Sequence, residues 1–296
     1  MRVAVVAGLV LIPTLSAQQN FDSVRVVVHP VAAGVHMLVG SGGNLGVSSG
    51  PDGVFVIDDQ YAPLTGKIVA AIRTVSDGPI RFVINTHWHG DHTGGNENFG
   101  QAGALLVAHD NVRARMSVEQ FIEQFNMRVP AAPAGALPVV TFTEAVTFYL
   151  NDDELQVFHV PHAHTDGDAL IRFRRANVIH MGDTFFNGNY PFIDLSSGGN
   201  VNGVIAAADT ALALSDDSTR IIPGHGPLGT RRDLQAYRDV VAAARDRVRD
   251  AIATGRSLEQ IKAAGLTREW DDRWGRGFIR PEQFVEFIYR SLRPGR

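Results

Sequence analysis

The feature that most constrains this chain is a histidine-rich stretch that directly follows a short apolar run. Residues 82–84, Phe-Val-Ile, are typical of a buried strand, and residues 86–92 have the sequence Thr-His-Trp-His-Gly-Asp-His. Imidazoles this close together would repel one another if protonated, and they are costly to bury even when neutral. A divalent metal removes both objections, because it binds the neutral ring nitrogen and also accepts carboxylate ligands. The stretch therefore predicts a metal site at the end of a strand.

The spacing of these side chains predicts more than one metal ion. His87 and His89 are two residues apart and can point to one side of an extended segment, whereas Asp91 and His92 fall on the next turn of the chain. One cation cannot easily take four ligands from so short a piece of chain, but two neighbouring cations can share them. The alternative is a surface loop that is rich in histidine by chance. It does not explain the glycines of the stretch, which allow the backbone to wrap around an ion.

The pattern His87-x-His89-x-Asp91-His92 after a hydrophobic strand resembles the signature of the metallo-β-lactamase superfamily of di-metal hydrolases. This resemblance implies further ligands at later strand ends, in a set order. The matching residues are His164 in His-Thr-Asp-Gly-Asp, Asp183 in Gly-Asp, and His225 in Pro-Gly-His-Gly. His162 competes with His164, and we assign it to the rim of the site. The resemblance extends over roughly residues 24–227.

The resemblance also implies how the ligands are shared between two metals. Asp183 would bridge them, and the remaining ligands form one set of His87, His89 and His164 and another of Asp91, His92 and His225. Nitrogen and oxygen ligands without sulfur suit zinc, and they also suit iron or manganese. We therefore expect two Zn²⁺ ions per chain.

Such a centre predicts hydrolysis. A water shared between two cations has its pKa lowered from about 15.7 to roughly 7, and the resulting hydroxide attacks a carbonyl or phosphoryl group. Asp91 is expected to orient this nucleophile. The favoured substrates contain an amide or ester-type bond, and a thioesterase, lactonase or phosphodiesterase of the same superfamily is the alternative. A metal- or ligand-binding protein without turnover is an alternative from a different class.

Within the superfamily the chain departs from the β-lactamases that have a sulfur ligand. Asp183 stands where those enzymes have cysteine, Phe186 stands where they have a substrate-binding lysine, and His92 is an additional histidine. These departures resemble the hydroxyacylglutathione hydrolases, or glyoxalase II type. Gly199-Asn200, by contrast, resembles the Gly-Asn whose side chain polarises a lactam carbonyl, so Asn200 is a candidate catalytic residue. We expect β-lactam hydrolysis to be weak.

The substrate walls are expected to be aromatic. No lysine lies between Asp183 and His225, so the carboxylate of a penicillin or carbapenem would lack a cationic partner there. Trp88, Phe186 and Tyr190 are the candidate wall residues. The alternative is that aromatic side chains in this region only pack beneath a loop.

Hydrophobic periodicity predicts an α/β protein, a four-layer αββα sandwich with C-terminal helices. Apolar strands and amphipathic helices alternate without βαβ regularity, which fits two sheets packed face to face with helices outside. The expected strands are 24–28, 35–39, 45–48, 54–57, 82–84, 103–108, 146–150, 155–160, 169–173 and 178–181. The expected helices are 62–75, 111–125, 231–253, 258–264 and 281–292, and residues 127–138 are expected to form a loop.

The first residues are typical of a signal peptide. Arg2 precedes the apolar segment 3–12, and Leu-Ser-Ala at 15–17 matches a cleavage site. We therefore expect export, to the periplasm in a Gram-negative host. Residues 18–296 would form one hydrolase domain, with 228–296 as its C-terminal helical part. The alternative for the first segment is a buried strand.

Composition limits the partners of the protein. A formal net charge of −4 argues against nucleic acid as the main partner, which leaves a small-molecule substrate. No segment after residue 17 is apolar enough to predict a membrane anchor. The sequence contains no cysteine, which excludes disulfides, a thiolate nucleophile and a cysteine metal ligand.

Overall fold

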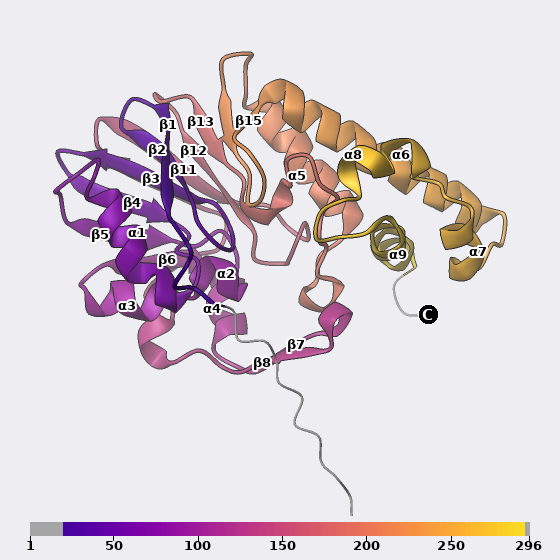
Figure 1. Ribbon diagram of the computed structural model, residues 1–296, viewed down its shortest axis with the longest axis horizontal. Coiled ribbons are helices and arrows are strands. Elements are labelled where there is room, and N and C mark those ends of the chain that lie inside the picture. Colours follow the sequence, from indigo (N-terminus) through magenta and orange to yellow (C-terminus); the bar gives the residue numbers. More distant parts are fainter. Residues whose placement is uncertain (1–19, 294–296) are drawn as a thin grey trace, which may run out of the picture.

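The computed structural model describes residues 20–293, so the expected signal peptide lies outside the described residues. Two β-sheets form the centre of the fold, and helices cover both of its outer sides (Figure 1). The expected four-layer αββα architecture with C-terminal helices is confirmed. Among residues 20–293, no helix has the length and apolar character that crossing a membrane requires.

The first sheet has the strand order β1-β2-β3-β4-β5-β6-β9. Its first four strands pair antiparallel, and β4, β5, β6 and β9 pair parallel. The bounds are β1 (Val27–Ala32), β2 (Val35–Val39), β3 (Leu45–Gly50), β4 (Gly53–Ile57), β5 (Ile80–Ile84), β6 (Leu105–His109) and β9 (Val140–Phe142).

The second sheet has the order β10-β11-β12-β13-β14-β15. All its pairs are antiparallel except β13 with β14. The bounds are β10 (Ala145–Leu150), β11 (Asp153–His159), β12 (Ala169–Phe173), β13 (Val178–His180), β14 (Arg220–Ile222) and β15 (Gly229–Thr230).

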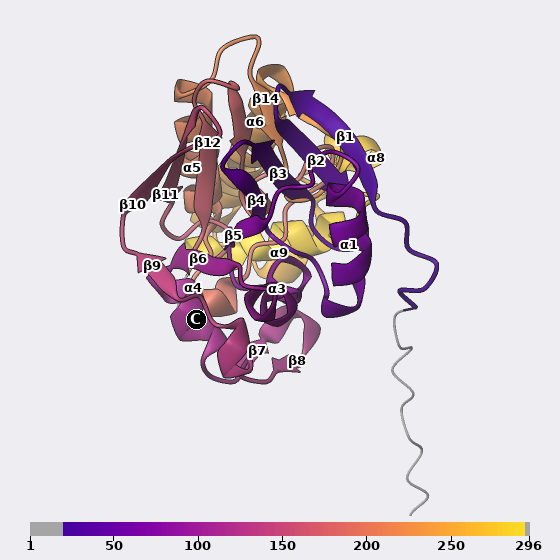
Figure 2. The same ribbon diagram turned by 90° about the vertical axis from the view of Figure 1, so that its left-hand side faces the viewer.

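Helices pack on the outer face of each sheet, as the two views together show (Figures 1 and 2). Ile68 of α1 and Phe99 of α3 pack on the first sheet, whereas Val204 of α5 and Val241 of α6 pack on the second. The bounds are α1 (Thr65–Ile72), α2 (Gly90–Thr93), α3 (Asn96–Gln101), α4 (Asp110–Met116), α5 (Val201–Ala213), α6 (Arg231–Ala253), α7 (Leu258–Ala263), α8 (Arg268–Trp274) and α9 (Pro281–Leu292).

The two sheets bury an apolar layer between them. Phe55 and Ile84 from the first sheet belong to the same buried cluster as Val157 and Ile171 from the second. The carboxyl ends of β5, β13 and β14 each lead directly into a polar loop. This packing holds those loops in place, and the candidate site is built on them.

The structure corrects the expectation of one helix over 111–125. Helix α4 ends at Met116, and the chain then forms a hairpin of β7 (Gln120–Ile122) and β8 (Met127–Val129), joined by a 3-10 turn at Glu123–Phe125. Asn126 closes this turn in the left-handed region, at φ 47°. Ile122 is buried in the core, and cross-strand pairing replaces helical hydrogen bonds here. The expected loop 127–138 therefore begins as a strand.

Candidate metal centre

The seven predicted ligand side chains come together at one edge of the sandwich. His87 and His89 follow β5, and the short helix α2 carries Asp91 and His92. The other three are His164 after β11, Asp183 in the 3-10 turn Gly182–Thr184 after β13, and His225 after β14.

Asp183 lies at the centre of this cluster. Its Oδ2 atom is 3.9 Å from His87 Nε2 and 3.6 Å from His164 Nε2. Its Oδ1 atom is 3.1 Å from His92 Nε2 and 3.4 Å from His225 Nε2. One carboxylate therefore faces two different groups of imidazoles, one with each oxygen.

These groups match the predicted sets. The candidate ligand atoms of His87, His89 and His164 lie within 4.8 Å of one another, and so do those of Asp91, His92 and His225. A third such group joins His87, His92 and Asp183 across the middle. That these residues bind metal stays a prediction of the geometry.

The residues fit a divalent cation. His87 Nε2, His92 Nε2 and Asp183 Oδ1 are buried and have no hydrogen-bond partner within residues 20–293. Such buried, unsatisfied polar atoms each cost about 1–3 kcal/mol, and a shared cation satisfies them together. Burial lowers the pKa of His87, and burial also lowers the pKa of His164 to about 4. Both imidazoles are therefore in the neutral form that coordinates a metal.

His92 and His225 lie in a strongly negative potential, which Asp91 and Asp183 create. Burial alone would lower the pKa of His225, but Asp183 and Asp91 together raise it to about 10. His92 behaves in the same way, because the carboxylates around it overcome the effect of its burial and raise its pKa. Carboxylates that hold a proton on an imidazole this strongly also favour a bound cation.

Carboxylates and a carbonyl orient three of the histidines from behind. His89 Nε2 is 3.0 Å from Asp194 Oδ2, which leaves its Nδ1 facing the cluster. His92 Nδ1 is 2.7 Å from Asp58 Oδ2, which leaves its Nε2 facing the cluster. His164 Nδ1 donates to the carbonyl oxygen of Phe192 at 2.8 Å. Such partners fix the tautomer and make the ligand more basic.

Sequence reasoning missed Asp58 and Asp194 as functional residues. Asp58 also accepts hydrogen bonds from the backbone N–H and the hydroxyl of Thr86, the residue before the first histidine. Asp194 accepts from the hydroxyl of Ser197, which in turn accepts from the indole N–H of Trp88. Each aspartate directly follows an apolar segment, which is an available sequence signal for a buried carboxylate.

Of the four predicted substrate residues, Trp88 and Phe186 lie beside predicted metal ligands, whereas Tyr190 and Asn200 make structural contacts instead. Phe186 stacks on His225, with ring centroids 5.2 Å apart, and Trp88 lies 4.7 Å from the His89 ring. Tyr190 is instead a core residue, because its hydroxyl donates to Asp271 and its ring stacks on a C-terminal phenylalanine. The expectation of a Tyr190 substrate wall is corrected accordingly.

Asn200 also has a different role from the expected one. Its side-chain oxygen accepts from the backbone N–H of Asn202 at the start of α5, and its amide donates to the carbonyl of Ser291 in α9. Both ends of the side chain are thus used to hold helices together, which indicates a structural role. His162 is exposed and belongs to none of the three candidate ligand groups, and its assignment to the rim stays a prediction.

Residues 40–225 match the sequence profile described as the metallo-beta-lactamase superfamily. The chain belongs to this superfamily. It is 30% identical over 166 residues to a hydroxyacylglutathione hydrolase of Polaromonas sp., a match that spans 55% of each chain. It is 24% identical over 282 residues to the lactamase-like protein aptB of Emericella nidulans, which covers 95% of this chain and 78% of that one.

Solved structures of other proteins share the fold. A metallo-beta-lactamase from Pontibacter korlensis superimposes with a TM-score of 0.59 at 18% identity, covering 74% of this chain and 99% of that one. A sec-alkylsulfatase from Pseudomonas sp. gives a TM-score of 0.66 at 17% identity, covering 90% of this chain and 50% of that one. These similarities show the shared fold, and within it the histidine–aspartate cluster suits a divalent metal.

Proposed function

We propose that the protein is a di-zinc hydrolase that cleaves an ester-type bond in a small molecule. The observation that carries this proposal is the position of Asp183, whose two oxygens face separate groups of histidines at 3.1 to 3.9 Å. A single bridging carboxylate between two such groups suits a pair of cations better than one. Nitrogen and oxygen donors without sulfur favour zinc and leave iron or manganese as alternatives.

When bound, the metals would lower the pKa of a nucleophilic water and polarise the scissile carbonyl. The residue placed to orient that water is Asp91. Burial alone would raise its pKa, but His92 and His225 together lower the pKa of Asp91 to about 2, so the group stays a carboxylate. Its side chain is 23% exposed, which makes it the more accessible of the two carboxylates in the cluster. Asp91 can therefore accept a hydrogen bond from water at the mouth of the site.

The neighbouring side chains favour an uncharged acyl group over a β-lactam. Phe186 is 5% exposed and packs on His225, so its ring gives this side of the centre an apolar surface. The two lysines of the sequence are engaged elsewhere: Lys67 binds three backbone carbonyls, and Lys262 pairs with Glu286. Thioesters and lactones are therefore the preferred class, and β-lactam turnover is weak. The similarity to hydroxyacylglutathione hydrolase supports the thioester.

Metal analysis combined with a substrate panel tests the proposal. Purified protein should contain close to two equivalents of zinc, and His89→Ala and Asp91→Asn should lose turnover while remaining folded. His162→Ala is the matched control, because this exposed histidine lies two residues from His164 outside the cluster. A folded wild-type protein that binds no metal would refute the proposal.

The panel of nitrocefin, a thioester, a lactone and a phosphodiester separates the alternatives. Preference for the phosphodiester would assign the protein to that branch of the superfamily instead. Failure on every substrate with metal bound would favour a binding protein without turnover.

We also propose that the protein is exported, on the basis of the sequence pattern of residues 1–17. Expression of the full chain in a Gram-negative host should yield a periplasmic protein whose N-terminal sequence begins at Gln18. Recovery of the uncleaved chain from the cytoplasm would contradict the export proposal and leave the hydrolase proposal intact.

A further inference from the structure

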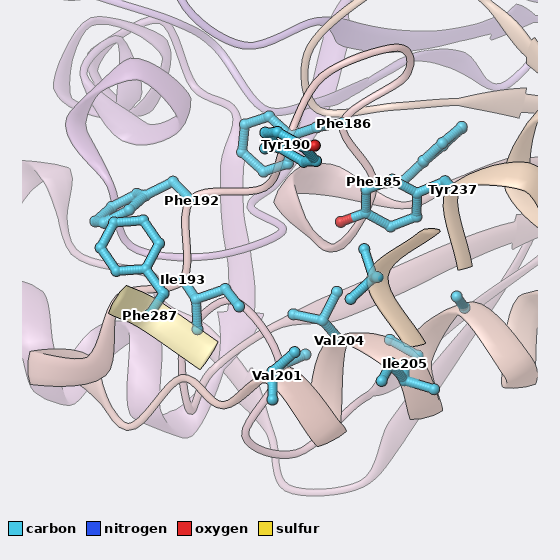
Figure 3. Close-up of a cluster of buried hydrophobic side chains, with 14 of the residues drawn as sticks. Phe185, Phe186, Tyr190, Phe192, Ile193, Val201, Val204, Ile205, Tyr237 and Phe287 are labelled. Carbon is cyan, nitrogen blue, oxygen red and sulfur yellow. The ribbon is translucent and has the colours of Figure 1, made fainter. Parts of the chain in front are cut away.

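Phe192 links the metal centre to the aromatic side chains beyond it. Its ring stacks on His89 at a centroid distance of 5.8 Å and meets the His164 ring edge-on at 5.4 Å. Its backbone carbonyl also accepts the hydrogen bond of His164. Figure 3 shows Phe192 beside Phe287 of α9, apart from the group of Phe185 and Tyr237.

Two further phenylalanines continue outward from Phe192. Phe125, in the turn between β7 and β8, lies 4.9 Å from Phe192, and Phe278, in the segment before α9, lies 5.2 Å from Phe125. Exposure rises along this series, because Phe192 is buried, Phe125 is partly buried and Phe278 is 71% exposed. We call these three residues the phenylalanine strip. It runs from two predicted metal ligands to solvent.

Polar contacts hold the inner and middle parts of the strip together. Glu123, at the start of the turn that carries Phe125, accepts from Arg290 of α9 at 2.7 Å. The backbone N–H of Glu123 donates to the hydroxyl of Ser196, in the loop that follows Phe192. The hairpin is thus attached both to the loop beside the metal centre and to the C-terminal helices.

Three arginines near the strip are paired with carboxylates. Arg290 binds Glu123, and Arg128 on the same hairpin binds Glu119 at 2.7 Å. Arg115 binds Asp166 through two hydrogen bonds of 2.7 Å each. A carboxylate on the substrate would compete with Glu123, Glu119 or Asp166 for these three arginines, whereas an apolar group can contact the exposed rings without such a cost.

We propose that the phenylalanine strip binds an uncharged alkyl or aryl group of the substrate, which extends from the scissile bond at the metals toward Phe278. The inference deepens the proposed function and rests on it for the identity of the reaction. The exposed Phe278 and the partly buried Phe125 offer an apolar chain a contact surface that leads toward the buried Phe192 beside the centre. The enzyme therefore discriminates by apolar chain length, with each methylene that is buried improving binding by roughly two- to fourfold.

Uncharged p-nitrophenyl esters from acetate to decanoate test this proposal on the zinc-loaded full-length protein. For wild type, kcat/KM should rise with chain length, and Phe278→Ala should lower kcat/KM at least tenfold more for octanoate than for acetate. Tyr149→Ala is the matched control, since Tyr149 is 75% exposed on β10 and should leave the whole series unchanged. Rates independent of chain length in wild type, or an equal loss for all esters in Phe278→Ala, would overturn the proposal.

A binding measurement separates the strip from the reaction. The neutral fluorophore N-phenyl-1-naphthylamine should bind zinc-loaded wild type and Tyr149→Ala equally, and Phe278→Ala at least fivefold more weakly. That result supports the strip even if no ester is hydrolysed, in which case only the proposed function fails. Equal binding to wild type and Phe278→Ala would refute the strip, whatever the enzyme hydrolyses.

Discussion

Asp194 decides how His89 is presented to a metal. Its Oδ2 atom accepts from His89 Nε2 at 3.0 Å and from the Ser197 hydroxyl at 2.5 Å, while Oδ1 accepts from Ser196 and from a backbone N–H. Although burial opposes it, these hydrogen bonds hold the pKa of Asp194 far below its usual range. The group is therefore a permanent anion that makes His89 a stronger ligand.

Replacing this anion should weaken metal binding more than it weakens the fold. Asp194→Asn keeps a hydrogen-bond acceptor but removes the charge, and we expect zinc affinity to fall about 10- to 100-fold. Competition with a chromophoric chelator measures the affinity. Ser196→Ala is the control, because it removes one bond to Oδ1 and should stay within about threefold of wild type. Unchanged affinity in Asp194→Asn would show that the carboxylate only supports its loop.

His180 predicts a pH dependence of stability. Its Nε2 donates to the carbonyl of Asn44 and its Nδ1 accepts from the N–H of Gly182, both at 3.2 Å, so the ring must be neutral. Burial lowers the pKa of His180 from 6.5 to about 4. Between these pH values the unfolded chain binds a proton that the folded chain does not, so stability falls as the pH falls from 6.5 to 4.

For one group such as His180, the free energy of unfolding changes by roughly 1.4 kcal/mol for each pH unit between its two pKa values. Urea unfolding with excess chelator between pH 4 and 7 should therefore show a smaller slope of unfolding free energy against pH in His180→Gln than in wild type. Identical slopes would mean that the folded protein accommodates a charged His180.

Individual elements could be predicted where a local pattern agrees with the packing. Residues 35–39 and 231–253 were expected as a strand and a helix, and the structure has them as β2 and α6 with these bounds. Thr230 and Asp233 form a capping box, which marks the start of α6 in the sequence. The prediction of one helix over 111–125 was wrong. The second part of this segment forms β7, which pairs with β8 further along the chain, and hydrophobic periodicity does not reveal such pairing.

The same distinction applies to the candidate site. The seven ligand positions could be proposed from sequence because each stands in a compact motif at a strand end. Asp194 follows an apolar segment, which signals a buried carboxylate, but no local pattern links it to its partner His89, 105 residues away. Asn200 and Tyr190 resembled site residues by position, and only the packing of α9 shows that they hold helices together.

The C-terminal helices pack against the rest of the protein. Phe284 of α9 is fully buried and stacks on Tyr190 at 4.4 Å. Phe284→Ala should therefore cost about 3–5 kcal/mol of unfolding free energy, in one cooperative urea transition. Phe278→Ala provides the comparison, because this exposed side chain should cost about 0.5 kcal/mol or less. Two separate transitions would instead show that residues 228–296 unfold independently.

At the level of the whole molecule, the metal centre joins loops from both sheets. The first sheet supplies His87 through the loop after β5, and the second supplies His164, Asp183 and His225 through the loops after β11, β13 and β14. Unpartnered ligand atoms are buried where these loops meet. A cation that binds there connects the two sheets, so its binding energy also stabilises their association.

Removing metal should therefore lower the stability of the entire domain. Free zinc at 100 times its dissociation constant stabilises the folded state by about 2.7 kcal/mol, so chelation should lower the melting temperature by several degrees. Zinc should restore the melting temperature of wild type and of His162→Ala, whose ring lies outside the cluster. Asp183→Asn should recover much less, because it weakens the one group that faces both sets of histidines. Full recovery in Asp183→Asn would mean that metal binding does not depend on a bridging carboxylate.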